Sequence, residues 1–424
     1  MKTYFSGADI LLPAADTDMT KWSVVACDQF TSQPEYWEST AAFIENAPST
    51  LNFILPECFL ESVTPDDIHA IQTKMKTMLS EDFFQVHENV LIYVERTDSA
   101  GKMRAGLVGK IDLEEYDYHA DSISKIRPTE ATIIERIPPR MKVRQGASLE
   151  TPHIMLLIDD VMQTIIEPLG QMCDALQVAY DFPLMNSGGH IKGYFVQGEC
   201  RDNVLLALHQ LCDETLFFEK YNMPDKAPVF FATGDGNHSL ATAKACYEHL
   251  KRTYPDQDLS NHPARYALVE LVNLHSPALE FEPIHRIVTS VDANYLLQDM
   301  MNVLGLIPAT MDTEQLQQIG IVRNGNINAF AITRPTSKIA VGSLQHYLDD
   351  FLNKHSGEID YIHGDDVLCD LTKRENCIGF LLPTPQKADL FPSVISDGAL
   401  PRKTFSMGHA EDKRYYLECR KIVE

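Results

Sequence analysis

The segment Pro228–Arg252, PVFFATGDGNHSLATAKACYEHLKR, gives the strongest indication of the fold that we expect for this chain. Its first part is an apolar run typical of a buried strand, and its last part has the spacing of a helix. Between them lies Gly-Asp-Gly-Asn-His, whose glycines permit a tight turn and the close approach of a ligand. A strand that leads through a glycine-rich corner into a helix is typical of a protein in which strands and helices alternate.

The polar residues of this corner predict an anion-binding site. The first N–H groups of a helix have no partners within it, and the helix dipole places partial positive charge there. We therefore expect a phosphate to bind at Gly234, Gly236, Asn237 and Ser239. Asp235 could hold a metal ion or act as a base, and His238 could donate to a phosphoryl oxygen or move a proton. The alternative is a capped turn whose histidine packs locally.

Other segments could complete such a site. Their cations are Arg127 in RPTEAT, His285 and Arg286 in LEFEPIHRIV, and Arg402 and Lys403 in DGALPRKTFSMG. A guanidinium matches the geometry of a phosphate, which favours binding of an anionic ligand. Asp28, at the end of the predicted strand Trp22–Phe30, and Glu130, in RPTEAT, are candidate catalytic carboxylates. For each segment the alternative is an ordinary loop or a solvated surface.

Charge and composition exclude several classes of protein. The 424 residues are 44% hydrophobic and 23% charged, and the formal net charge is −24. Such an acidic chain repels phosphate backbones, which disfavours nucleic-acid binding. We find no signal peptide and no apolar run of about 20 residues, so we expect a cytoplasmic protein without a membrane span. The nine cysteines are scattered, which favours reduced thiols over disulfides or structural zinc.

The alternation of strands and helices predicts an α/β class, with an α+β mixed sheet. We expect an N-terminal α/β subdomain over 1–125, a core with the phosphate-binding turn over 126–290, and a C-terminal α+β subdomain over 291–424. Helices are predicted over Val161–Gln177 and Asn203–Tyr221. Hairpins are predicted around DSAGK and around Asn324-Gly325.

Four motifs together resemble a family of bacteria and archaea, the DUF (domain of unknown function) ten-fifteen family, whose members are sometimes labelled SpoOJ/ParB-like. The motifs are GDGNHSLATA, RPTEAT, PIHR and PRKTF, which occur across nearly the whole chain. The corner also resembles, more distantly, the phosphate-binding turn of the ParB/sulfiredoxin-like fold, which includes free-serine kinases. This resemblance implies a ParB/sulfiredoxin-like core that binds nucleotide phosphates. Ser239 departs from the pattern, because an arginine commonly follows the histidine there.

These observations lead to three hypotheses on function. The first is a phosphotransferase, or a phosphohydrolase with the same site, that acts on a small hydroxylated metabolite. The resemblance implies free L-serine as the acceptor. The donor could be a nucleotide (ATP or ADP) or an inorganic polyphosphate, and Asp235 would bind Mg²⁺. The second is a ParB-like nucleotide-binding regulator associated with DNA, and the third is a protein that binds a phosphorylated metabolite without turnover. A homodimer is compatible with each of them.

Overall fold

The computed structural model describes residues 4–408 and 413–424, and the chain forms two compact units. Unit 1 comprises Met1–Pro128, Thr132–Leu279 and His409–Glu424, and unit 2 comprises Thr129–Ala131 and Glu280–Gly408. The expected boundary at residue 290 lies close to the start of the main part of unit 2. The expected boundary at residue 125 lies inside unit 1, only a few residues before its first segment ends.

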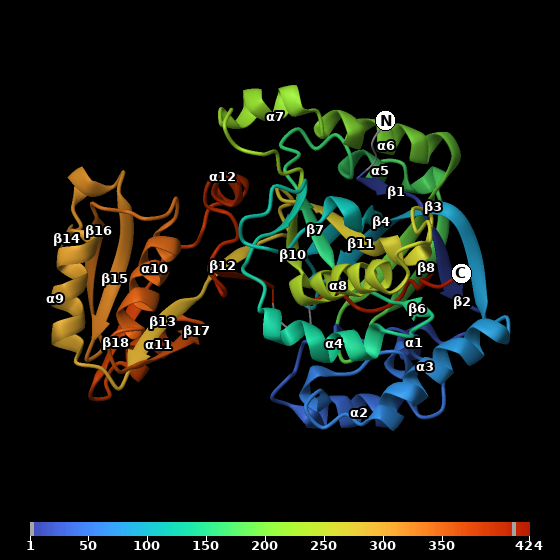
Figure 1. Cartoon of the computed structure of the whole chain (residues 1–424), viewed down its shortest axis with the longest axis horizontal. Coiled ribbons are helices and arrows are strands. Elements are labelled where there is room, and N and C mark those ends of the chain that lie inside the picture. The colour runs from blue at the N-terminus through green and yellow to red at the C-terminus, as the bar shows by residue number, and fades with distance from the viewer. Residues whose placement is uncertain (1–3, 409–412) are drawn as a thin grey trace. The chain divides into compact units, whose positions relative to one another are not determined.

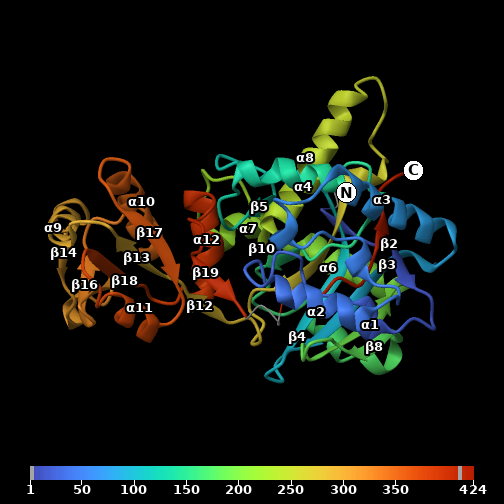
Figure 2. The ribbon, with the colours of Figure 1, turned by 90° about the horizontal axis from the view of Figure 1, so that it is seen from below.

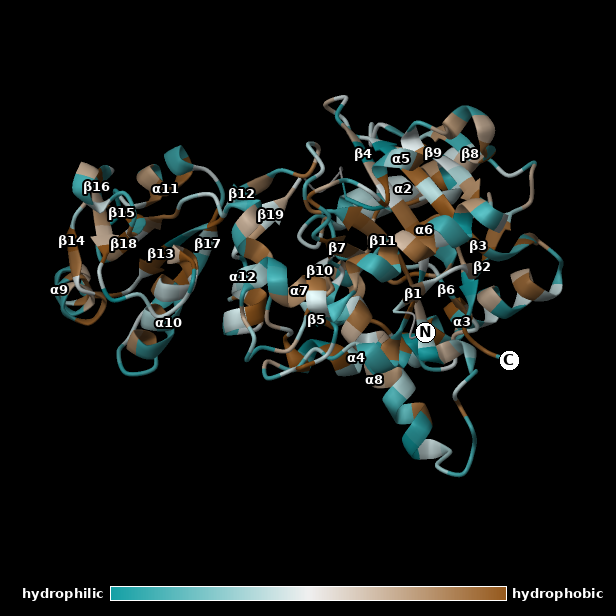
Figure 3. Cartoon of the chain, turned by 90° about the horizontal axis from the view of Figure 1, so that it is seen from above, coloured by the Kyte–Doolittle hydropathy of each residue, from teal (hydrophilic) through white to brown (hydrophobic). Residues whose placement is uncertain are grey.

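Unit 1 is built on a mixed β-sheet, which confirms the predicted α/β class (Figure 1). In the described part of unit 1 the sheet has ten strands. Along the sheet they are β5 (Ile126–Pro128), β10 (Phe231–Asp235), β7 (Met155–Ile158), β11 (Tyr266–Asn273), β4 (Met103–Asp112), β3 (Phe84–Thr97), β9 (His190–Val196) and β8 (Gln177–Pro183), with β1 (Phe5–Ser6) on β4 and β2 (Ala8–Pro13) on β3. β10 runs parallel to β5 and antiparallel to β7. β11 is almost entirely buried, and Figure 3 shows the hydrophobic colour of much of this strand.

Helices pack around this sheet. They are α1 (Met19–Trp22), α2 (Pro34–Ile44), α3 (Pro65–Ser80), α4 (Ile137–Arg144), α5 (Glu167–Gly170), α6 (Gly198–Leu211), α7 (Glu214–Tyr221) and α8 (Asn237–Thr253). α4 and α8 lie side by side, as Figures 1 and 2 both show. In the described part of the chain, no helix is long and apolar enough to cross a membrane.

The segment 413–424 follows unit 2 in sequence but packs into unit 1. Its short strand β20 (Arg420–Lys421) pairs with β6 (Leu149–Glu150). The Trp22 indole N–H donates to the Leu417 carbonyl at 2.9 Å, and Val25 forms a β-bridge with Tyr415. These contacts fix the loop that follows Trp22.

Unit 2 has a sheet of its own, with six strands in its described part. Their order is β14 (Leu306–Pro308), β16 (Asn326–Ile332), β15 (Gln317–Arg323), β18 (Cys377–Leu381), β13 (His285–Thr289) and β17 (Glu358–Ile362). A second pair of strands consists of β12 (Phe281–Pro283) and β19 (Phe405–Met407). The helices of this unit are α9 (Ala293–Leu304), α10 (Ala340–Leu352), α11 (Asp365–Leu371) and α12 (Lys387–Asp397).

The two predicted hairpins are present, as β3–β4 and β15–β16, and β10 leads into α8 as expected. The prediction of one helix over Val161–Gln177 is wrong, because this segment contains only the one-turn helix α5 and a 3₁₀ turn. The Asp160 carboxylate accepts hydrogen bonds from the Thr164 and Ile165 amides and so stabilises a turn at its start.

Two further predictions also need correction. The predicted helix Asn203–Tyr221 is two helices, because the Asp213 side chain caps a new start at α7. The predicted strand Trp22–Phe30 is a loop, since α1 ends at Trp22 and only Val25 forms a bridge.

Candidate functional site

The pairing of two antiparallel strands positions the candidate site in unit 1. β10 ends at Asp235 and β7 begins at Met155, and these two residues are register partners. The residues just before β7 therefore lie against the corner just after β10. A Cβ built on Gly236 would lie 2.9 Å from the Ile154 Cα and 3.4 Å from the His153 ring.

His153 joins three segments that are distant in the sequence. Its Nε2 lies 3.6 Å from the Asp28 Oδ2 and 3.5 Å from the Ser239 Oγ at the start of α8. Its Nδ1 lies 2.7 Å from the Tyr416 hydroxyl in the C-terminal segment. The imidazole is 3% exposed, so these neighbours fix its orientation. Asp28, predicted from the sequence alone, is thereby brought to the predicted corner.

Asp28 and His153 shift each other's pKa in opposite directions. Burial alone would raise the pKa of the Asp28 carboxyl, but the His153 imidazolium, the Gln29 side chain and the Lys413 charge lower it below its usual range. Burial alone would lower the pKa of His153, but the Asp28 carboxylate raises it above its usual range. Because each stabilises the charged form of the other, Asp28 is a carboxylate at neutral pH.

The start of α8 has the geometry expected for an anion site. Gly236 is the N-cap residue in the left-handed region, with φ 75°, and no side chain caps the helix. A residue other than glycine would be strained in this conformation and would collide with Ile154. The side-chain oxygen of Asn237 is buried without a hydrogen-bond partner. The predicted residues Gly234, Gly236, Asn237 and Ser239 therefore lie together at this corner.

His238 is neutral at pH 7. Burial, together with the charges of Arg140 and Arg136, lowers its pKa to about 4. Its Nε2 lies 3.3 Å from the Ile133 amide, which donates to it. The ring proton of the neutral form must then be on Nδ1, where it can act as a donor.

Both carboxylate oxygens of Asp235 have partners. Oδ1 accepts from the Gly236 amide at 2.8 Å, and Oδ2 lies 3.3 Å from the Lys413 ammonium. Among residues 4–408 and 413–424, no group of three or more histidine, cysteine, aspartate or glutamate side chains could hold a metal ion. The arrangement thus fits a carboxylate that positions Lys413 better than it fits a resident metal site.

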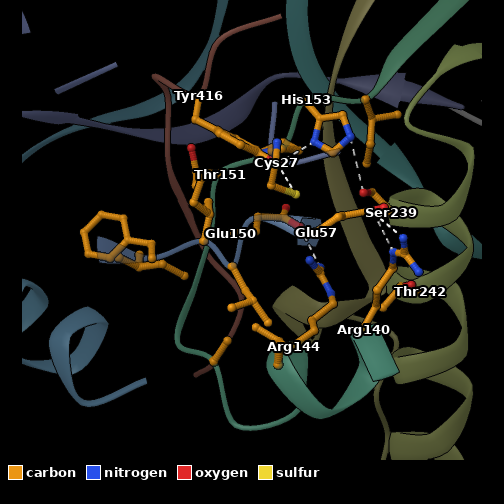
Figure 4. Close-up of a pocket in the computed structure, with 18 of the residues that line it drawn as sticks. Cys27, Glu57, Arg140, Arg144, Glu150, Thr151, His153, Ser239, Thr242 and Tyr416 are labelled. Atoms are coloured by element: carbon orange, nitrogen blue, oxygen red, sulfur yellow. Dashed lines mark hydrogen bonds and ion pairs between the residues drawn. The ribbon is translucent and has the colours of Figure 1, made fainter. Parts of the chain in front are cut away.

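A cavity of about 160 Å³ lies beside this cluster, and Figure 4 shows part of its wall. His153, Ser239, Thr242 and Tyr416 line one side. Two ion pairs also line it: Arg140 with Glu57, and Arg144 with Glu150 at 2.6 Å. The rest of the wall is largely apolar, with Phe53, Ile54, Leu55, Leu60, Met75 and Val143 among its residues.

A second set of predicted residues lies together in unit 2. The Glu130 carboxylate accepts hydrogen bonds from the amides of Lys403, at 3.1 Å, and Thr404, at 3.0 Å. It holds Lys403 at φ 58°, a conformation that is rare for this residue type. Burial raises the pKa of Glu130, against the effect of these two amides. This geometry favours a structural role over the predicted catalytic one.

Two of the predicted phosphate ligands of unit 2 are buried. The Arg286 guanidinium donates to the Ile284, Arg402 and Lys403 carbonyls and to the Gln345 side chain, and it has no exposed surface. His285 is 1% exposed, and its Nε2 lies 2.8 Å from Asp365.

Arg402 is exposed and donates to the Tyr361 hydroxyl at 3.1 Å. The positions of Arg286 and His285 therefore favour structural roles, while Arg402 and Lys403 stay accessible. Arg127, in unit 1, is also buried and donates to the Ser124 and Ala227 carbonyls.

Sequence reasoning missed several residues of the candidate site: Glu57, His153, Lys413 and Tyr416. His153 stands directly before the apolar run Ile154–Ile158, and a polar residue at the start of a predicted strand was the signal that could have found it. Tyr416 and Lys413 gave no such signal, because only the folded chain brings the C-terminal segment to this corner.

The family model described as "Protein of unknown function (DUF1015)" matches residues 10–351. The chain belongs to this family. The match confirms the family that the four motifs indicated, and the description assigns no activity. No curated protein matches the chain.

Several solved structures are distantly similar to the chain. A free serine kinase in complex with AMP has 12% identity and a TM-score of 0.37, with 74% of this chain and 90% of that chain covered. A conserved hypothetical protein from Pyrococcus furiosus has 11% identity and a TM-score of 0.35, with 74% and 94% covered. SbnI from Staphylococcus aureus, with a C-terminal truncation, has 8% identity and a TM-score of 0.36, with 71% and 82% covered. Likenesses at this level do not assign an activity to the chain.

Proposed function

We propose that the chain is a phosphoryl-transfer enzyme that acts on a small hydroxylated metabolite. The observation that carries this proposal is the position of His153, whose Nε2 lies between Asp28 and Ser239. It places an ordered carboxylate beside the amino end of α8. Phosphoryl transfer needs such positioning and charge neutralisation more than covalent chemistry.

In this proposal the amino end of α8 binds the phosphate that is transferred. The uncapped start at Gly236 supplies amide donors and the positive end of the helix dipole. Lys413 adds positive charge beside Asp235, and the neutral His238 can donate from Nδ1. These groups would stabilise the negative charge on the phosphoryl oxygens.

Asp28 would orient the acceptor hydroxyl. The acceptor oxygen forms a bond to the phosphorus, the bond between phosphorus and the bridging oxygen of the donor breaks, and the hydroxyl proton passes to solvent. Because the transition state is loose, orientation by a carboxylate that stays ionised suffices, and strong basicity is not needed. His153 and Tyr416 would hold the carboxylate in place.

The donor in this proposal is a nucleotide or an inorganic polyphosphate. A magnesium ion, when bound, would neutralise phosphate charge, and Asp235 is its predicted ligand. The ion would have to arrive with the phosphates, since magnesium usually takes only one or two protein carboxylates. Arg402 and Lys403, which are exposed in unit 2, remain predicted phosphate ligands.

Phosphorus NMR tests the proposal. The protein is incubated with ATP, ADP or polyphosphate and a panel of hydroxylated compounds, with free L-serine first because of the resemblance to serine kinases. We expect a new phosphomonoester signal that is absent with Asp28→Asn. Binding of a phosphorylated metabolite without any product would instead support a binding protein, and a salt-dependent DNA mobility shift would support the regulator.

A further inference from the structure

We propose that the cavity beside His153 binds an uncharged, apolar group of the acceptor, about as large as a benzene ring. This inference rests on the proposed function and narrows its substrate class. The acceptor would be an aromatic or bulky aliphatic alcohol rather than free L-serine.

The size of the cavity supports a group of this kind. Its volume is about 160 Å³. An apolar protein cavity of about 150 Å³ is large enough to bind benzene. The side chain of serine is a single hydroxymethyl group, which would leave most of this volume unfilled and lose the packing contacts that the walls offer.

The walls of the cavity favour an uncharged group. Half of the lining residues are apolar: Phe53, Ile54, Leu55, Leu60, Met75, Val143, Ala147, Leu149, Pro152 and Ile154. The charged residues in the wall already have partners of opposite charge, Arg140 with Glu57, Arg144 with Glu150, and His153 with Asp28. A further carboxylate, phosphate or ammonium would enter without a counter-charge, which is unfavourable at a partly buried site.

The location of the cavity favours the acceptor over the base of a nucleotide donor. His153 and Ser239 line the cavity and are also the residues that meet Asp28 and the start of α8. Asp28 itself does not line the cavity, but His153 does and lies 3.6 Å from it, so a group bound there would hold an adjacent hydroxyl beside the Asp28–His153 pair. A nucleobase is separated from its terminal phosphate by a ribose and further phosphates, so it would have to bind farther from the reacting atoms.

A matched pair of probes tests this binding directly. 2-Phenylethanol and ethanol share a hydroxyl group and differ in the aromatic ring. In ligand-observed NMR titrations with the full-length protein, we expect 2-phenylethanol to bind at least about 10-fold more tightly, because the ring loses its apolar contact with water. Equal affinities for the two alcohols would overturn the inference.

A cavity-filling variant locates the binding. Val143, which is half-buried on α4, lines the cavity, and Val143→Phe should weaken 2-phenylethanol binding about 10-fold by occupying part of the volume. The control is Val178→Phe, at an exposed valine of β8 outside the cavity, which should leave the affinity unchanged. Thermal unfolding of both variants reports whether they fold. An unchanged affinity in a folded Val143→Phe protein would refute the assignment.

Two further measurements separate this inference from the proposed function. If adenosine competes with 2-phenylethanol, the cavity binds the nucleobase and the acceptor assignment is wrong. If L-serine is phosphorylated equally by wild type and Val143→Phe while 2-phenylethanol is not, the proposed function stands and the inference fails. If 2-phenylethanol binds in the cavity but no alcohol is phosphorylated with any donor, the proposed function fails and the cavity remains a binding site.

Discussion

The Oδ2 of Asp28 lies 3.6 Å from the Nε2 of His153, although 124 positions separate the two residues in the numbering. In this pair the His153 side chain is buried, whereas 28% of the Asp28 side chain is exposed. A carboxylate that a buried histidine holds in place, and that is itself partly exposed, is suited to orient a bound hydroxyl group.

Asp28→Asn should lower phosphoryl transfer at least about 100-fold, since the orienting charge is lost. The same change should lower the pKa of His153, because the Asp28 carboxylate is what raises it. Histidine titration by NMR measures this second effect without any assay of activity. Asp181→Asn is the matched control, since Asp181 pairs with His190 at 3.1 Å on the exposed surface. A His153 pKa that is unchanged in Asp28→Asn would contradict the pairing.

His238 should make the protein less stable in mild acid. Its pKa is about 4 in the folded protein, against 6.5 as the ordinary value. Between these values the unfolded chain binds more protons, so the free energy of unfolding decreases as the pH falls from about 6.5 to about 4. Urea unfolding across this pH range should show a smaller decrease for His238→Gln than for wild type. His249→Gln, at an exposed position of the same helix, should follow wild type, and identical curves for all three proteins would argue against the buried environment of His238.

Gly236→Ala should destabilise unit 1 for two reasons that can be separated. The positive φ costs about 1–2 kcal/mol in any residue with a Cβ. The new methyl group would also lie 2.9 Å from the Ile154 Cα, so β7 and the helix start would have to move apart. Gly101 has a similar φ, 83°, and no atom lies within 4 Å of a Cβ built on it. Gly101→Ala therefore measures the cost of the positive φ alone. Equal losses in urea unfolding would mean that the corner accommodates the methyl group.

Glu130→Ala should release the loop around Lys403 in unit 2. Two backbone amides would lose their acceptor, and because the bond to Lys403 is exposed and the bond to Thr404 is only partly buried, the loss of stability should be about 1 kcal/mol. Hydrogen exchange of the Lys403 and Thr404 amides should therefore become faster, and Glu130→Gln should restore part of the protection through its remaining carbonyl oxygen. Glu282→Ala, at an exposed position of β12, serves as the control. If Glu130→Ala loses activity while hydrogen exchange of the Lys403 and Thr404 amides stays unchanged, the catalytic role first predicted for Glu130 would be supported instead.

The sequence predicted the elements whose signals are local. The passage from β10 through Gly236 into α8 follows from an apolar run, a glycine that tolerates positive φ, and helical spacing. The helix predicted over Val161–Gln177 failed because Asp160, just before it, forms a competing turn. The spacing of apolar residues, on which the helix prediction was based, contains no information about such a hydrogen bond.

The candidate site was predictable only in part, because long-range pairing assembles it. Asp28 was predicted as a carboxylate at the end of a strand, but its partner His153 is placed by the antiparallel register of β7 and β10. Arg286 shows the opposite case. An arginine next to a histidine suggested a phosphate ligand, yet its donors are taken up by carbonyls inside unit 2. Burial of an arginine is rare and is set by packing that a local pattern does not contain.

The return of residues 413–424 to unit 1 has a consequence for biosynthesis. Tyr416, which orients His153, and Arg414, which forms a buried ion pair with Glu270 of β11, are translated after the whole of unit 2. On the ribosome, unit 2 can therefore fold while unit 1 still lacks the residues that close its interior. Nascent chains stalled before residue 413 should expose the apolar surface around Trp22 to chaperones, and that exposure should end once the final segment leaves the exit tunnel.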